Sequence, residues 1–185
     1  MPSYKFRILI DTEDEEEVFR DIVISGNADF EQFYQAIIQS FDFRGDQLAS
    51  FYVSNDNWDK GHEIALMDME LSESLDSPSI MKETIIQELV TTSKQKFILV
   101  YDFLKMWCFL VELVEVIQEN YEFPMLDLSV GESPLEDSKE IDLSGGFEMS
   151  GHSSVNLGND FDDIFSDDPE DDEFGGFENI DDIDI

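Results

Sequence analysis

Two stretches of alternating apolar and polar residues open the chain and predict a β-hairpin. YKFRILI (4–10) has the period of two that is typical of a half-buried strand, and VFRDIVI (18–24) forms a second such stretch. The acidic run DTEDEEE (11–17) between them fits a solvated turn, and SGNAD (25–29) ends the second strand. The first strand has an apolar side and a basic side, formed by Tyr4, Phe6, Ile8 and Ile10 against Lys5 and Arg7.

The period then changes to that of an α-helix over residues 28–41. Asp29 is a suitable N-cap, with Gln32 three residues later as in a capping box, and Gly45 is expected to end the helix. Residues 48–54 alternate again and predict a third strand, which gives the order ββαβ. The apolar residues of the helix share one face, which consists of Phe30, Phe33, Tyr34, Ile37, Ile38 and Phe41.

Three shorter segments follow. NDNWDKG (55–61) faintly resembles a calcium-binding loop, but its glycine comes one place late and Leu66 stands where a glutamate belongs, so we expect a plain turn. HEIALMDMEL (62–71) is compatible with a short strand. SIMKETIIQEL (79–89) predicts a short helix, with Ser79 in the position of a cap.

The most apolar stretch, FILVYDFLKMWCFLVELVEVI (97–117), is compatible with two structures. Its polar residues recur at spacings of 3 and 4, as in an amphipathic helix, whereas its β-branched and aromatic residues favour two strands. The pattern alone leaves these alternatives open. A membrane helix is not expected, because a charge at the bilayer centre costs about 2.5–3.5 kcal/mol and the stretch holds Asp102, Lys105, Glu112 and Glu115.

The charge of the chain restricts its partners. The 185 residues include 45 acidic and 10 basic residues, a formal net charge of −35, and 20 of the acids but only one base lie in residues 127–185. Phosphate groups are bound by Lys and Arg, so we expect no direct binding to nucleic acid or to anionic membranes. The negative charge is compatible with binding to a basic partner protein, with binding to a cation, or with a role in solubility alone.

Composition divides the chain into three parts. The 42% hydrophobic content is enough for one core, which we place in residues 1–126, or up to 137. A Gly/Ser-rich linker (127–159) and an acidic, disordered tail (160–185) follow. Acidic–hydrophobic alternation is typical of segments that bind a basic, apolar groove, although a solubilising tail fits equally well. The candidate contact residues of the tail are Phe161, Ile164, Phe165, Phe174 and Phe177.

The sequence contains no catalytic, metal or cofactor motif. Its two histidines, His62 and His152, are far apart, and no Gly-rich phosphate loop is present. The single cysteine, Cys108, is expected to be a buried, inert thiol, and with an N-terminus unlike a signal peptide it predicts a cytoplasmic location. Asp102 and Trp107 are candidate interaction residues. An acid in an apolar run needs a partner or a role in a turn, so Asp102 is expected more often to cap the connection between two strands than to bind a partner, and Trp107 fits the core better than a binding site.

Several segments together resemble the root-inducing-plasmid ORF-3-like family, whose members are also described as insertion-element passenger TnpR-like proteins. The resemblance covers about residues 4–137 and is carried by YKFRILI, by VFRDIVI with Phe19-Arg20, by FEQFYQAIIQSFDF and by YDFLKMW (101–107). It implies that 97–117 forms two strands, roughly 97–102 and 107–117. The fold class is then α+β, with a mixed or antiparallel sheet, one main helix, a β-grasp-like ββαβ start, a short helix and a terminal hairpin.

The chain departs from the family pattern where that pattern has polar residues. Leu104 and Lys105 replace a Gly-Asp turn, and Phe109 and Gln47 stand where histidines are usual. SVGESPLED (129–137) echoes a PPED segment without its cysteines. If these polar residues form a site in the family, much of that site is absent from this chain.

These features predict a non-enzymatic interaction or adaptor module without a cofactor, whose acidic tail binds basic partners. An alternative is an accessory factor of a mobile element that acts on DNA indirectly, by binding a basic DNA-binding protein or by mimicking the charge of DNA. A third hypothesis is that the chain has a hydrolytic or ligand-binding site around Asp102.

Overall fold

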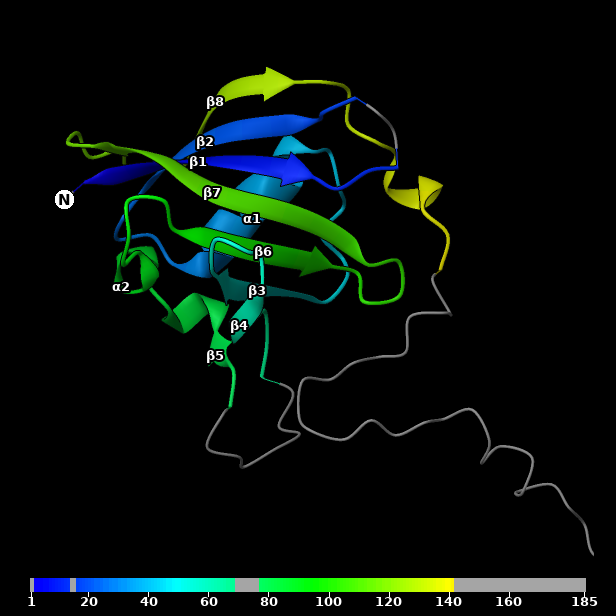
Figure 1. Ribbon diagram of the computed structural model, residues 1–185, viewed down its shortest axis with the longest axis horizontal. Helices are drawn as coiled ribbons and strands as arrows, with labels where there is room; N and C mark the ends of the chain where they lie inside the picture. Colours follow the sequence, from blue (N-terminus) through cyan, green and yellow to red (C-terminus); the bar gives the residue numbers. More distant parts are fainter. Residues whose placement is uncertain (1, 14–15, 69–76, 142–185) are drawn as a thin grey trace, which may run out of the picture. The chain divides into compact units, whose positions relative to one another are not determined.

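The computed structural model describes residues 2–13, 16–68 and 77–141, which lie within one compact unit (Figure 1). No helix in these ranges has the length and apolar content that crossing a membrane requires. The helical segments are α1 (Phe30–Ser40), the 3₁₀ turn η1 (Met81–Glu83), α2 (Ile86–Leu89) and the 3₁₀ turn η2 (Glu136–Ser138). The strands are β1 (Ser3–Ile10), β2 (Phe19–Ser25), β3 (Ala49–Ser54), β4 (Lys60–Ala65), β5 (Ser79–Ile80), β6 (Lys96–Tyr101), β7 (Trp107–Ile117) and β8 (Met125–Val130).

The strands of the described residues form one sheet in the order β5-β4-β3-β6-β7-β1-β2-β8. Neighbouring strands are antiparallel except β4 and β5, which are parallel. The α+β class, the mixed sheet and the ββαβ start are therefore confirmed. The stretch 97–117 is a hairpin of β6 and β7, paired from Lys96 opposite Glu112 to Tyr101 opposite Trp107, so the two-strand alternative is correct.

Helix α1 packs on one face of the sheet and supplies the centre of the core (Figure 1). Phe30, Phe33 and Ile37 are fully buried. The ring of Phe33 stacks on Phe51 of β3 with 5.6 Å between centroids, and lies 4.8 Å from the ring of Phe6 of β1. The apolar face predicted from the period of 3.6 residues is therefore the face that the helix buries.

The helix begins where the sequence predicts and ends earlier. The side chain of Asp29 accepts a hydrogen bond from the backbone N–H of Gln32 at 2.8 Å, which confirms the N-cap. The helix ends at Ser40, and the left-handed residue that closes it is Asp42 (φ +59°), so the expectation for Gly45 was wrong. Aspartate tolerates this conformation, and its N–H and that of the next residue bond to carbonyls of the last turn, as in a Schellman motif.

The short helix predicted over 79–89 is reduced to the single turn α2. Thr84 is extended between η1 and α2. The N–H of Phe30 donates to the carbonyl of Thr84 at 3.0 Å, and the N–H of Ile86 donates to the carbonyl of Ala28 at 3.0 Å. Pairing with the segment before α1 therefore uses backbone groups that a longer helix would need for its own hydrogen bonds.

The folded unit continues past residue 126. Strand β8 pairs with β2 from Val23 opposite Met125 to Phe19 opposite Val130, and η2 follows. Residues 127–138 are therefore folded, which agrees with the later of the two predicted domain ends, 137, and not with the earlier one, 126. The tail contact residues predicted from the sequence lie outside the described residues, and these are Phe161, Ile164, Phe165, Phe174 and Phe177.

Arg20 is a buried cation that joins α1 to the sheet and to the segment after β8. It points to the helix side of β2 and is 5% exposed. Its Nε donates to the carbonyl of Ser40 at 3.0 Å, at the negative end of the dipole of α1. Its Nη1 donates to the carbonyls of Phe19, Val130 and Gly131 at 2.8, 2.8 and 3.2 Å. Burial lowers the pKa of Arg20, and these carbonyls stabilise its charged form.

Replacement of Arg20 by Met should lower the free energy of unfolding by about 3 kcal/mol, because buried carbonyls lose their donor. Urea denaturation of the full chain measures this change. Lys82→Met is the matched control, since Lys82 is exposed and its loss should cost less than about 0.5 kcal/mol. Equal stability of the two variants would show that Arg20 does not hold these elements together.

Strand β8 is the edge strand of the sheet, and a bulge hinders its pairing with strands of other molecules. All its residues are exposed, and four of them are apolar. A flat edge of this composition would attract other strands. The register with β2 shifts between Asp21 and Ile22, which puts Asp127 in a bulge, and its carboxylate lies 2.6 Å from Nζ of Lys5 on β1. A bulge and an inward-pointing charge are devices that block pairing between molecules.

Asp127→Val should promote self-association, because it removes the charge from the bulge and leaves a mostly apolar edge. Size-exclusion chromatography with light scattering, over a series of protein concentrations, checks this expectation. Glu122→Val changes the same charge at an exposed position outside the strand and is the control. If both variants stay at the mass of the unchanged chain, the bulge does not protect the edge.

Candidate interaction surface on the open face of the sheet

The face of the sheet opposite α1 carries an apolar row across six strands. Directly opposed residues of neighbouring strands point to the same face, so the register alone defines this row. Its members range from buried to exposed, and most are half-buried. From β8 to β3 they are Val130, Phe19, Leu9, Leu110, Ile98 and Tyr52.

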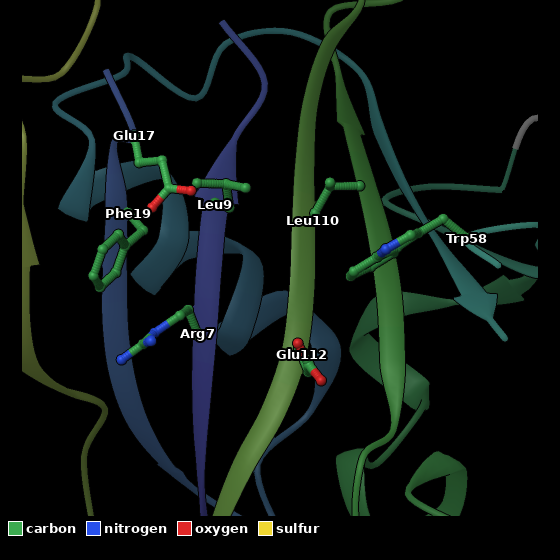
Figure 2. Close-up of a pocket in the computed structure, with 7 residues that line it drawn as sticks. All are labelled: Arg7, Leu9, Glu17, Phe19, Trp58, Leu110 and Glu112. Atoms are coloured by element: carbon green, nitrogen blue, oxygen red, sulfur yellow. The ribbon is translucent and has the colours of Figure 1, made fainter. Parts of the chain in front are cut away.

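A hollow of about 330 Å³ opens on this row (Figure 2). Its floor is formed by Leu9 of β1 and Leu110 of β7, which are register partners. Figure 2 shows Phe19 on one side of this floor and Trp58 on the other. The remaining lining residues are Arg7, Glu17 and Glu112. Ligand pockets usually measure about 300–1,000 Å³, so this hollow suits a single side chain or a small ligand.

Trp58 reaches this face from a hydrogen-bonded turn. The side-chain oxygen of Asn55 accepts the N–H groups of Asn57 and Asp59, each at 3.0 Å, as in an Asx turn. Trp58 has a φ of +62°, a conformation that costs about 1–3 kcal/mol for a residue other than glycine. Its ring lies 4.6 Å from Nζ of Lys96. No group of His, Cys, Asp and Glu in the described ranges is arranged to hold a metal ion.

A row of alternating charge lies beside the apolar row and consists of Asp21, Arg7, Glu112 and Lys96. Arg7 donates two hydrogen bonds to Asp21, both at 2.8 Å, and this pair raises the pKa of Arg7. The carboxylates of Glu112 and Glu17 make no hydrogen bond or ion pair with any other residue that the structure describes, although both attract Arg7 through space. The hollow therefore presents two carboxylates that a ligand can use.

This arrangement is suited to binding. An apolar floor, aromatic sides and two carboxylates fit a ligand that is partly apolar and carries a positive charge. Cys108 lies on the same face and is partly exposed. Burial raises the pKa of its thiol, which disfavours the thiolate that nucleophilic chemistry needs.

Asp102 closes the turn between β6 and β7. It is 7% exposed and has a φ of +59°. One carboxylate oxygen accepts the N–H groups of Leu104 at 3.1 Å and Lys105 at 3.2 Å, and the N–H of Asp102 donates to the carbonyl of Leu48 at 2.9 Å. The side chain therefore has the turn role that a buried acid requires, and little of its surface is free for a partner.

Trp107 lies beneath the segment 131–139, which we call the clasp. The side chain is 3% exposed, and its Nε1–H donates to the carbonyl of Glu136 at 3.2 Å. The carboxylate of Glu136 is buried and accepts the hydroxyl of Tyr101 and the backbone N–H of Arg44, both at 2.8 Å. Glu136 therefore fixes the clasp to β6, to β7 and to the segment after α1.

Asp137 holds the clasp from the solvent side. Arg44 donates two hydrogen bonds to it at 2.9 and 3.0 Å, and Lys105 donates one at 2.9 Å. These cations hold the pKa of Asp137 well below its usual range. Burial and the neighbouring carboxylate raise the pKa of Tyr101. Burial raises the pKa of Tyr34 to about 12, and its hydroxyl has no hydrogen-bond partner among the described residues.

Comparison with known proteins places the chain in a family. The model of the plasmid pRiA4b ORF-3-like proteins matches residues 2–151. The chain belongs to the plasmid pRiA4b ORF-3-like family. No curated protein matches it. The crystal structure of a protein of unknown function from Methanosarcina mazei Go1 matches with a TM-score of 0.63 at 20% identity, covering 75% of each chain, which shows a shared fold.

The clasp unites two segments that resemble the ORF-3-like family pattern. YDFLKMW contributes Tyr101 and Trp107, and SVGESPLED contributes Glu136, which bonds to both. Lys105, one of the departures from the ORF-3-like pattern, pairs with Asp137 of the same clasp. In this chain the two segments therefore stabilise the fold together.

Sequence reasoning missed the lining of the hollow. Phe19, Leu9, Leu110 and Trp58 come from four separate segments, and only the strand order brings them to one place. One signal was present, since Leu9 is apolar on the side of its strand that also carries Arg7. That signal does not reveal which strands are neighbours.

Glu136→Ala should lower the free energy of unfolding by about 2–3 kcal/mol, because the buried hydroxyl of Tyr101 and the N–H of Arg44 lose their acceptor. Chemical denaturation gives the value. Glu132→Ala removes an exposed carboxylate four residues earlier and should change stability by less than about 0.5 kcal/mol. A stability of Glu136→Ala equal to that of Glu132→Ala would mean that the clasp adds nothing to the fold.

Proposed function

We propose that this chain is a non-enzymatic protein-interaction module, located in the cytoplasm, that binds a basic partner protein through the open face of its sheet. The observation that carries the proposal is the apolar row beside the carboxylates of Glu17 and Glu112, which form no hydrogen bond or ion pair in the part of the chain that the structure describes. Side chains of Leu9, Leu110 and Phe19 remain partly exposed there, and a partner that covers them gains about 25 cal/mol for each Å² of apolar surface removed from water.

The charge of the chain supports a basic partner. At a net charge of −35 the long-range field repels anions and accelerates encounters with cationic proteins. The acidic tail that the sequence predicts would add to this field. The partner segment should therefore be both basic and apolar, so that the field attracts it and the apolar row retains it.

The test uses a fluorescently labelled peptide that alternates arginine and valine, titrated with the full chain. A second peptide with serine in place of valine keeps the charge and removes the apolar contacts. The arginine–valine peptide should bind more tightly, and the difference should persist from about 0.1 M to about 1 M salt, where charge attraction alone is screened within about 3 Å. Equal affinities would reduce the interaction to unspecific charge attraction and contradict the proposal.

A pair of variants locates the binding surface. Leu110→Arg places a cation on the floor of the hollow and should weaken binding of the arginine–valine peptide by tenfold or more, about 1.4 kcal/mol. Val114→Arg makes the same charge change at an exposed position of the same strand and should have a small effect. Thermal unfolding must be similar for both variants. Equal weakening by the two would show that the added charge, and not the apolar floor of the hollow, decides the effect, which contradicts binding at the hollow.

A further inference from the structure

The hollow has features that select one kind of side chain, and this inference rests on the proposed function. Its floor is the pair Leu9 and Leu110, which face each other across β1 and β7. Phe19 and Trp58 flank the floor on opposite sides (Figure 2). Phe19 is two strands away from β7 and Trp58 lies over β6, so the walls are separated by about three strand spacings, or about 14 Å. A long, unbranched side chain can lie across this floor.

Both aromatic walls already contact a cation of the chain itself. The guanidinium carbon of Arg7 lies 4.5 Å from the ring centroid of Phe19, and Nζ of Lys96 lies 4.6 Å from that of Trp58. Cations are attracted to the faces of such rings, most strongly to tryptophan. The walls of the hollow are therefore surfaces at which a positive group is stabilised.

The charges of the lining leave a place for one more cation. Arg7 is neutralised by the two hydrogen bonds to Asp21, and Lys96 contacts Trp58. Glu17 and Glu112 have no such partner among the described residues. A cation that enters the hollow meets a carboxylate at either end, and the nearest cation of the chain, Arg7, is hydrogen-bonded to Asp21 and is also attracted to Glu17 and Glu112.

We propose that the hollow between Phe19 and Trp58 binds one arginine side chain of the partner, with its methylene stem on Leu9 and Leu110 and its guanidinium on one of the two carboxylates that lie at opposite ends of the hollow, Glu17 or Glu112. Arginine fits better than lysine for two reasons. Its planar group stacks on aromatic rings, and its five N–H donors form paired hydrogen bonds with carboxylates. Its stem is apolar and can cover the two leucines.

The experiment varies one residue of a labelled peptide that carries a single arginine among valines and serines. Replacement of that arginine by citrulline keeps the shape and removes the charge, and we expect binding to the full chain to weaken about tenfold. Replacement by lysine should weaken it by a smaller factor. If the citrulline peptide binds as tightly as the arginine peptide, the hollow does not recognise arginine, and the proposal is overturned.

Variants of the chain then assign the recognition to the hollow. In a variant with both Glu17→Gln and Glu112→Gln, the arginine and citrulline peptides should bind with similar affinities. In the control Glu119→Gln, which changes an exposed carboxylate outside the hollow, the difference should remain. An undiminished preference for arginine in the double variant would overturn the assignment of the site. The Leu110→Arg and Val114→Arg pair separates this failure from failure of the proposed function, because that pair tests the apolar floor and not the carboxylates.

Discussion

The buried guanidinium of Arg20 is the interaction on which the layers of this protein depend. Its position on the inner side of β2 brings a cation to the last turn of α1, where the carbonyl ends of the helix are negative. The same group bonds to the carbonyls of Val130 and Gly131. One side chain therefore determines where the main helix ends on the sheet and where the chain leaves β8. A buried cation is costly unless all its donors are used, and here carbonyl and hydroxyl oxygens accept them.

The clasp follows from this arrangement. After Gly131 the chain turns toward the β6–β7 hairpin, and the carboxylate of Glu136 becomes buried against Tyr101. The clasp explains why two segments of the family pattern occur together in this chain. Residues of the YDFLKMW segment form hydrogen bonds with Glu136 of the SVGESPLED segment. Phe109, which stands in place of a polar residue of the family pattern, is fully buried in the core. Of the four departures from the family pattern, Phe109 therefore contributes to the core and Lys105 to the clasp, whereas Leu104 and Gln47 are exposed.

The two faces of the sheet have different roles. One face is covered by α1 and is closed by aromatic packing. The other retains an apolar row, two aromatic walls and two carboxylates that make no hydrogen bond or ion pair within the described ranges, and its Trp58 is held in a left-handed conformation by its turn. Strained backbone of the kind found at Trp58 is most frequent at active sites and ligand-binding sites. The proposed function and the arginine pocket both rest on this contrast.

The sequence by itself determined the elements whose signals are local. The period of two in 4–10, the helical period after Asp29 and the cap itself depend on residues a few positions apart, so they can be found without the fold. The sequence could not decide between helix and hairpin for 97–117, because both fit the same apolar residues, and only family resemblance favoured the hairpin. It also left the end of the domain open between residues 126 and 137, because the pairing of β8 and the burial of Glu136 depend on distant partners. Only the tertiary structure decided that Phe19, Leu9, Leu110 and Trp58 line one hollow, because strand order and register join segments that are far apart in the chain.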